Sequence, residues 1–143
     1  MPKIEKWWHK DPDSHRLGIG VILHWKPTGW VVDRTLLGSP AEKAGIKPGD
    51  VIVSLNEFGL GAREDIRESW MHKESPFRIS LMRGGSEQAA QSIEAKTLRE
   101  LFDEEEKLGG SLVGCYTCYD CYDTSNGYRQ CGEGGCSGEC ASA

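Results

Sequence analysis

The fold is decided by residues 38–55, which read Gly-Ser-Pro-Ala-Glu-Lys-Ala-Gly-Ile-Lys-Pro-Gly-Asp-Val-Ile-Val-Ser-Leu. Ser39 is a favourable helix N-cap, Pro40 suits the first helical position, and Glu42 completes a capping box. Gly45 is placed to end the helix in the left-handed conformation, which glycine adopts without a Cβ penalty. The first half of the stretch therefore predicts a short helix with a signal at each end.

The second half of the stretch predicts a tight turn and a strand. Pro48 and Gly49 suit the two central positions of a type II turn, where the second position requires a positive φ. The run that follows alternates, and it places on one face Val51, Val53 and Leu55. A capped helix, a turn and a strand are thus expected in direct succession.

Composition limits what the chain can be. It has 143 residues, a formal net charge of −5 and a pI near 5.4, which suits one domain of ordinary size with some additional chain. The acidic balance argues against nucleic acid as a partner, because phosphate binding needs a clustered basic face. No apolar run approaches the roughly 18–20 residues that cross a bilayer, so no transmembrane segment is expected. The N-terminus lacks the apolar core of a signal peptide, and a cytoplasmic location is expected.

Further strands and helices are predicted on both sides of the opening stretch. Glycines lead into an apolar run, β-branched residues follow a turn, and a later run alternates between polar and apolar positions. Ile66 and Trp70 are four positions apart and would share one face of a helix. The predicted elements are strands at 17–25, 30–37, 77–82 and within 87–97, and helices at 62–72 and 97–108.

The cysteines divide the chain into two parts. All six lie between Cys115 and Cys140, so residues 1–114 contain none. The pair Gly109-Gly110 ends the last helical pattern, and glycine and cysteine dominate beyond it. The predicted organisation is a polar N-terminal arm, a main domain, a helical linker ending in Gly-Gly and a Cys/Gly-rich tail, at residues 1–14, 15–96, 97–110 and 111–143.

Five motifs stand in the order of a known domain family. They are Leu17-Gly18-Ile19-Gly20-Val21, Gly29-Trp30-Val31-Val32, Ser39 to Asp50, Asp65-Ile66 and Arg83-Gly84-Gly85. Over residues 15–96 the chain resembles PDZ domains, most closely the bacterial kind found with serine proteases of the high-temperature-requirement family. The resemblance implies an α+β, mostly β fold. This would be a PDZ-like, partly open β-barrel or sandwich of about five to six strands capped by two helices, followed by an irregular Cys-rich tail.

The resemblance also implies a mode of binding. A ligand strand would add to the exposed edge at about Ile19 to His24, and main-chain hydrogen bonds would supply the affinity. The backbone N–H groups of Gly18, Ile19 and Gly20 would point at a terminal carboxylate. The implied partner is a protein C-terminus or an extended peptide segment, with a preference for a hydrophobic last residue. The residues implied in this peptide site are Leu17, Gly18, Ile19, Gly20, Val21, Ile66 and Trp70.

The apolar residues of this set have a structural alternative, which is burial in the core. Leu17 and Ile19 are expected in the ligand pocket, because pockets of this kind are mostly apolar. The role of Trp70 stays open between the two. The residues expected in the core are Val21, Val51, Val53, Ile66, Ile79 and Leu81.

The sequence predicts a binding protein rather than an enzyme. It contains four histidines but no Gly-x-Ser-x-Gly or similar nucleophile motif. No protease half accompanies the PDZ-like region. The chain is therefore expected to bind peptides without cutting them.

The tail carries six candidate metal ligands. Its first three cysteines follow a Cys-x2-Cys-x2-Cys pattern, and the last three follow a Cys-x4-Cys-x3-Cys pattern. Closely spaced thiolates suit tetrahedral zinc, to which the first, second, fourth and fifth cysteines could supply four sulfurs. An iron–sulfur cluster is the weaker interpretation, because residues 122–125 replace the continuation that such a run needs. The candidates are Cys115, Cys118, Cys121, Cys131, Cys136 and Cys140.

Other interpretations of the tail stay open. In an oxidising compartment six cysteines would form three disulfides, and the tail could also be unstructured with free thiols. A metal-handling or redox protein that uses the PDZ domain for docking is a second hypothesis. A third is the precursor of a ribosomally made, modified peptide with its core after Gly110, because Gly109-Gly110 follows an acidic helix.

Overall fold

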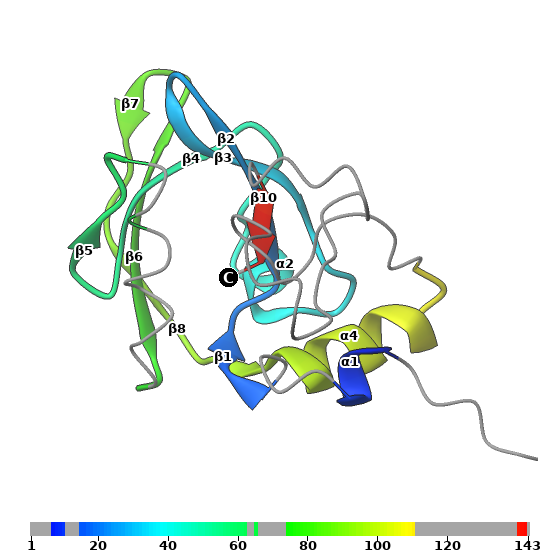
Figure 1. Cartoon of the computed structure of the whole chain (residues 1–143). Helices are drawn as coiled ribbons and strands as arrows, with labels where there is room; N and C mark the ends of the chain where they lie inside the picture. The colour runs from blue at the N-terminus through cyan, green and yellow to red at the C-terminus, as the bar shows by residue number, and fades with distance from the viewer. Residues whose placement is uncertain (1–6, 11–14, 63–64, 66–73, 111–139, 143) are drawn as a thin grey trace, which may run out of the picture.

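The computed structural model describes residues 7–10, 15–62, 65, 74–110 and 140–142. Within this part of the chain the main sheet has eight strands in the spatial order β10-β2-β3-β4-β6-β7, with β5 paired to β4 and β8 paired to β6 (Figure 1). These strands are β2 Val21–Lys26, β3 Gly29–Thr35, β4 Val51–Leu55, β5 Phe58–Gly59, β6 Phe77–Arg83, β7 Ser86–Glu87, β8 Gln91–Ile93 and β10 Cys140–Ser142. A separate two-stranded sheet joins β1 to β9. The remaining elements are β1 Leu17–Gly18, β9 Lys96–Thr97, α1 Trp7–Lys10, α2 Pro40–Lys43 and α4 Leu98–Lys107.

The mostly β, α+β class expected from the sequence is confirmed. The path of the main sheet ends at β10 on one side and at β7 on the other, so the sheet stays open rather than closing into a barrel. The expected partly open arrangement takes the form of open sheets with helices packed against them. The helix predicted at 62–72 falls almost wholly outside the described residues, as does the tail except for β10.

The helix and the turn predicted from the opening stretch are both present. The Glu42 N–H donates to Ser39 Oγ at 3.1 Å, so Ser39 caps α2 as predicted. The reciprocal bond of the capping box differs from the prediction, because the N–H of Gly38 rather than that of Ser39 donates to Glu42 Oε1, at 2.9 Å. Gly45 and Gly49 have φ values of 87° and 93°. Glycine adopts this left-handed conformation without strain, as predicted for both positions.

Asp50 holds the turn between α2 and β4. Its carboxylate accepts a hydrogen bond from the Lys47 N–H at 2.9 Å. It also accepts two bonds from Arg83, whose Nε and Nη2 lie 2.8 and 2.7 Å from the two carboxylate oxygens. The bonds from Arg83 hold the pKa of Asp50 below its ordinary value. The turn is thereby joined to the end of β6, which lies far along the chain.

The main core takes its side chains chiefly from β2, β3, β4 and β6. On β4, Ile52 and Leu55 are buried, whereas Val51 and Val53 are half-buried. The register between β4 and β6 shifts between Ile52 and Ser54, and this bulge brings Leu55 to the face of Ile52. The predicted shared face, and the predicted burial of both valines, are therefore wrong. The main core comprises Ile19, Val21, Leu23, Trp30, Val32, Ala41, Ile46, Ile52, Leu55, Leu60, Phe77, Ile79, Leu81 and Ile93.

A second core lies on the other face of β2, under α1 and α4. Neighbouring residues of a strand point to opposite faces, and Ile22 accordingly joins this second cluster while Leu23 joins the first. Trp8 is 3% exposed, its Nε1 donates to Asp103 Oδ1 at 2.8 Å, and its ring meets that of Phe102 edge-on. Parts of the predicted arm and linker, α1 and α4, thus pack against each other, and α4 also contacts β1 and β9 (Figure 1). This core comprises Trp8, Ile22, Leu36, Leu98, Leu101 and Phe102.

Glu105 joins α4 to β3 from a fully buried position. Its carboxylate accepts hydrogen bonds from Arg34 Nη1 at 3.1 and 3.2 Å and from the Leu37 N–H at 2.6 Å. Gly109 follows α4 with a φ of 92°, and the Gly110 N–H donates to the Glu105 carbonyl at 2.8 Å. A side chain on Gly110 would overlap the Glu105 carboxylate. The glycine pair is accounted for as the end of this helix.

Candidate functional site

One edge of the main sheet is formed by β2 and is covered by β10, drawn in red in Figure 1. The two strands are antiparallel, and residues 140, 141 and 142 lie opposite His24, Leu23 and Ile22 respectively. On its other side β2 pairs with β3 along its whole length. Without β10, β2 would therefore be the outermost strand on this side. This is the edge at which the resemblance to PDZ domains implies the addition of a ligand strand.

The glycine loop before β2 is held by the domain itself. Residues 17–18 form β1 and pair with β9. The Ile19 carbonyl accepts a hydrogen bond from the Ala41 N–H at 2.9 Å, and the Gly20 carbonyl accepts one from the Leu36 N–H at 2.8 Å. These bonds fix the loop against the start of α2 and the end of β3. The predicted contact of the loop N–H groups with a ligand carboxylate stays a prediction.

Gly20 has a packing role that the sequence did not reveal. Its φ is 94°, in the region that favours glycine. A Cβ at this position would lie 2.7 Å from Ser39 Oγ and closer still to Ser39 Cβ. The loop therefore approaches the N-cap of α2 so closely that no side chain fits between them. A bulky residue at Gly20 would disturb the fold, so it cannot serve as a clean test of peptide binding.

The apolar residues of the loop are buried to different degrees. Ile19 is 0% exposed and Val21 is 1% exposed, and both belong to the main core. Val21 thus lies where the sequence predicts it. Leu17 is half-buried and packs at the margin of the same core. The loop therefore leaves one partly accessible apolar side chain, that of Leu17, beside the start of β2.

Several predicted site residues lie outside the described residues. Cys140 is within them and opens β10, where its backbone pairs with His24. In the part of the chain that the structure describes, no three His, Cys, Asp or Glu side chains gather into a group that could hold a metal ion. Zinc and the iron–sulfur cluster therefore stay predictions. The residues outside are Ile66, Trp70, Cys115, Cys118, Cys121, Cys131 and Cys136.

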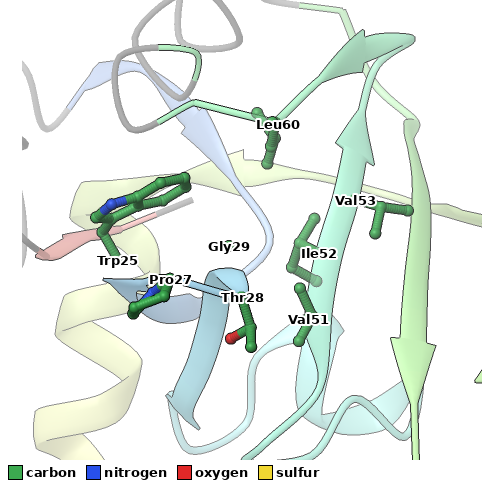
Figure 2. A pocket seen from close by; sticks show the side chains of 9 residues that line it. Trp25, Pro27, Thr28, Gly29, Val51, Ile52, Val53 and Leu60 are labelled. Atoms are coloured by element: carbon green, nitrogen blue, oxygen red, sulfur yellow. The ribbon is translucent and has the colours of Figure 1, made fainter. Parts of the chain in front are cut away.

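A pocket of about 200 Å³ opens at the far end of β2 (Figure 2). Trp25 and the hairpin turn at 27–29 line one side of it, and β4 together with Leu60 lines the other. Trp25 packs at a steep angle on the buried Trp30, with 5.6 Å between the ring centroids. Because the pairing is antiparallel, a ligand strand that continued past His24 would next run alongside Trp25.

Strand β10 is the element at this edge that the sequence did not predict. Residues 140–142 read Cys-Ala-Ser, which has neither the alternation nor the β-branched residues typical of a strand. Pairing at a sheet edge uses main-chain groups, so it requires no particular side chain. No local signal in the sequence could have marked this segment.

Comparison with known proteins agrees with this geometry. Residues 31–57 match the sequence profile of the PDZ domain family. A probable periplasmic serine endoprotease, DegP-like, from Hahella chejuensis is 56% identical over 39 residues, which are 26% of this chain and 8% of that relative. The chain therefore matches only a small part of that relative's length.

The solved structures that resemble the chain include the following two. The HtrA3 PDZ domain bound to a phage-derived ligand (FGRWV) has 25% sequence identity and a TM-score of 0.47, over 57% of this chain and 86% of that chain. The photosystem II D1 C-terminal processing protease has 20% identity and a TM-score of 0.51, over 62% of this chain and 25% of that chain. The second of these supports likeness of fold alone.

The described residues form an open, mostly β domain whose outer strand accepts a further strand through main-chain pairing. The profile match identifies a PDZ domain in the chain, and the open, mostly β architecture agrees with it. A PDZ domain is itself non-catalytic and is a module of protein–protein interaction. Among the described residues, no helix is long and apolar enough to cross a membrane.

Proposed function

We propose that this PDZ domain captures a protein C-terminus or an extended peptide segment by strand addition at β2, and that it does so without cutting the peptide. The observation that carries the proposal is the pairing of β10 with β2. A segment without any strand-like side-chain pattern pairs there through its backbone. The same row of main-chain groups would receive the backbone of another protein.

A ligand strand in this register would present its side chains alternately to two surroundings. Positions opposite Val21 and Leu23 would share the face of the main core, and the position opposite Ile22 would share the face covered by α4. Selectivity therefore depends on every second ligand residue, whereas the affinity from the main chain does not depend on sequence.

The last residue of the ligand is proposed to bind beside the glycine loop. The N–H groups of Gly18, Ile19 and Gly20 would receive the terminal carboxylate. The half-buried side chain of Leu17, together with the helix residues Ile66 and Trp70, would favour a hydrophobic side chain at that position.

Methylation of the ligand backbone tests strand addition without altering the domain. A ligand would be selected from a library of displayed C-termini against the full chain, and each of its backbone nitrogens would be methylated in turn. Only every second residue of an added strand bonds to its neighbour strand. Affinity should therefore fall at alternate positions, by about two- to tenfold for each lost bond of about 0.5–1.5 kcal/mol. A loss that is uniform along the peptide would contradict strand addition.

We also propose that the cysteine-rich tail binds zinc, on the support of its Cys-x2-Cys spacing. A cytoplasmic location is proposed with it, because a reducing compartment keeps thiols available as ligands. Metal analysis of protein purified without air should find close to one zinc per chain. The double substitution Cys115→Ser/Cys118→Ser should remove most of it, and a wild-type stoichiometry far below one would contradict the proposal.

The precursor and redox-docking hypotheses receive no support from the described residues. The Gly109-Gly110 pair on which the precursor hypothesis rests has a structural explanation as the end of α4. Intact-mass measurement on native material tests that hypothesis directly, because it requires cleavage after Gly110 or a mass change in the tail.

A further inference from the structure

We propose that β10 is the resident ligand of the β2 edge, bound in cis, and that an outside peptide must displace it to bind. This inference rests on the proposed function, because it names the segment that occupies the same site in the absence of a partner. It also gives the tail a role that neither the PDZ fold nor the cysteine spacing assigns to it.

The position of β10 is that of a ligand strand. It lies antiparallel to β2 at the outer end of the sheet order. Its three residues follow the register toward the glycine loop, since residue 140 lies opposite His24 and residue 142 lies opposite Ile22. An outside strand and β10 would need the same main-chain groups of β2, so the two cannot bind together.

The tail can reach this edge within one chain. Gly110 is anchored to Glu105, which is in turn bound to Arg34 of β3. Residues 111–139 connect this anchor to β10, and an extended segment of about thirty residues spans at most about 100 Å. That length exceeds the width of a domain whose radius of gyration is about 13 Å. The connecting segment is therefore long enough for β10 to bind the β2 edge of its own chain.

Tethering favours cis over trans binding at ordinary protein concentrations. Covalent connection of a segment to its binding site through a tether long enough to reach it gives an effective concentration in about the millimolar range. A tail segment with an intermolecular Kd of about 0.1 mM would then occupy the edge about nine-tenths of the time. An outside peptide would bind about tenfold more weakly than to a free edge, because only the free fraction is competent.

Displacement would also change the tail. With β10 on the edge, residues 111–139 are tethered at both ends, at Gly110 and at Cys140. Capture of an outside peptide would release the second of these ends. The proposal therefore couples occupancy of the peptide site to whether Cys140, the last of the six cysteines, is held at the edge of β2.

The test removes β10 from the edge by a change in its backbone. Only one of two adjacent N–H groups in an edge strand points at its neighbour, so the double substitution Ala141→Pro/Ser142→Pro removes whichever group bonds to β2. The matched control is Ser125→Pro/Asn126→Pro, which places two prolines in the tail outside β10. The probe is a fluorescent peptide with the sequence of residues 137–143 and serine in place of cysteine, used under reducing conditions.

The expected results depend on whether β10 occupies the edge of β2. Hydrogen exchange should reveal loss of protection at some amides of residues 22–24 in the Ala141→Pro/Ser142→Pro variant, with the other β2 and β6 amides unchanged. That variant should bind the probe about tenfold more tightly than the wild type and the control variant. Equal affinities of all three proteins, or unchanged protection of residues 22–24, would overturn the proposal.

Two further outcomes separate related explanations. A sedimentation coefficient that rises with wild-type concentration, and stops rising in the Ala141→Pro/Ser142→Pro variant, would overturn cis binding in favour of strand exchange between copies. If neither the probe nor any displayed C-terminus bound any form of the protein, the proposed function would fail. The exchange data would still decide whether β10 lies on the edge of β2.

Discussion

The substitution Gly20→Ala separates two reasons for which a glycine can be required. Gly20 has a φ of 94° and lies against Ser39, so an added methyl group meets both a strained backbone and a close neighbour. Gly49 is the matched control, because its φ is 93° and a Cβ there would have nothing within 4 Å. The difference between Gly20→Ala and Gly49→Ala therefore isolates the close approach of the loop to α2.

The magnitudes follow from these geometries. A Cβ in the left-handed region costs about 1–2 kcal/mol, and this term is common to both variants. At Gly20 the methyl group also overlaps Ser39, whose Cβ is one bond from the backbone and cannot swing away. Overpacking of this kind costs about 1–3 kcal/mol. We expect Gly20→Ala to lower the free energy of unfolding by about 2–5 kcal/mol, and Gly49→Ala by about 1–2 kcal/mol.

Urea unfolding of the wild type and both variants measures the difference. The double variant Gly20→Ala/Ser39→Gly provides a further check. Removal of the Ser39 side chain should restore most of the stability that Gly20→Ala loses beyond Gly49→Ala. The change from serine to glycine at the helix N-cap should itself lower the free energy of unfolding by only a few tenths of a kcal/mol. Equal destabilisation by Gly20→Ala and Gly49→Ala, or no recovery in the double variant, would refute the assigned packing role of the loop.

Three further predictions concern the groups that hold the two cores and the turn. Glu105→Gln should lower the free energy of unfolding by about 1–3 kcal/mol, because charge-assisted bonds from Arg34 are weakened, and an unchanged urea midpoint would contradict this. Acid should destabilise the fold. Because Arg83 lowers the folded-state pKa of Asp50 below the unfolded value near 3.9, its contribution is full above that value and is lost as pH falls through the folded pKa. Asp50→Asn should flatten this pH dependence, and a slope below pH 4 equal to that of the wild type would disprove the assignment. Trp8→Ala should lower the free energy of unfolding by about 3–5 kcal/mol, because a buried ring is lost. A thermal midpoint of unfolding that does not change would show that α1 lies outside the cooperative fold.

The elements that could be predicted from the sequence are those that depend on interactions between residues close together in the chain. Ser39, Gly45 and Gly49 act through hydrogen bonds and φ values of their own neighbourhood, and all three behave as predicted. The face of β4 could not be predicted in the same way. Its bulge between Ile52 and Ser54 arises from the register with β6, and alternation along one strand contains no information on its partner.

The packing of the chain ends was also hidden from sequence reasoning. Glu105 stands in an acidic run that is typical of a solvent-exposed helix face, and its burial depends on Arg34, which is remote in sequence. Strand β10 pairs through its main chain and has no pattern of its own. The residues of the glycine loop were predicted from their resemblance to a family. The internal bonds of Ile19 and Gly20 became visible only once α2 and β3 were in place.

Hydrogen exchange at β2 distinguishes peptide capture at this edge from binding elsewhere on the domain. The Ala141→Pro/Ser142→Pro variant would be saturated with a ligand selected from displayed C-termini and compared with the same variant alone. Strand addition predicts that the amides of residues 21–24 that face the edge gain at least tenfold protection, while the amides of β6 do not change. Protection that appears elsewhere and leaves residues 21–24 unchanged would contradict peptide capture at this edge.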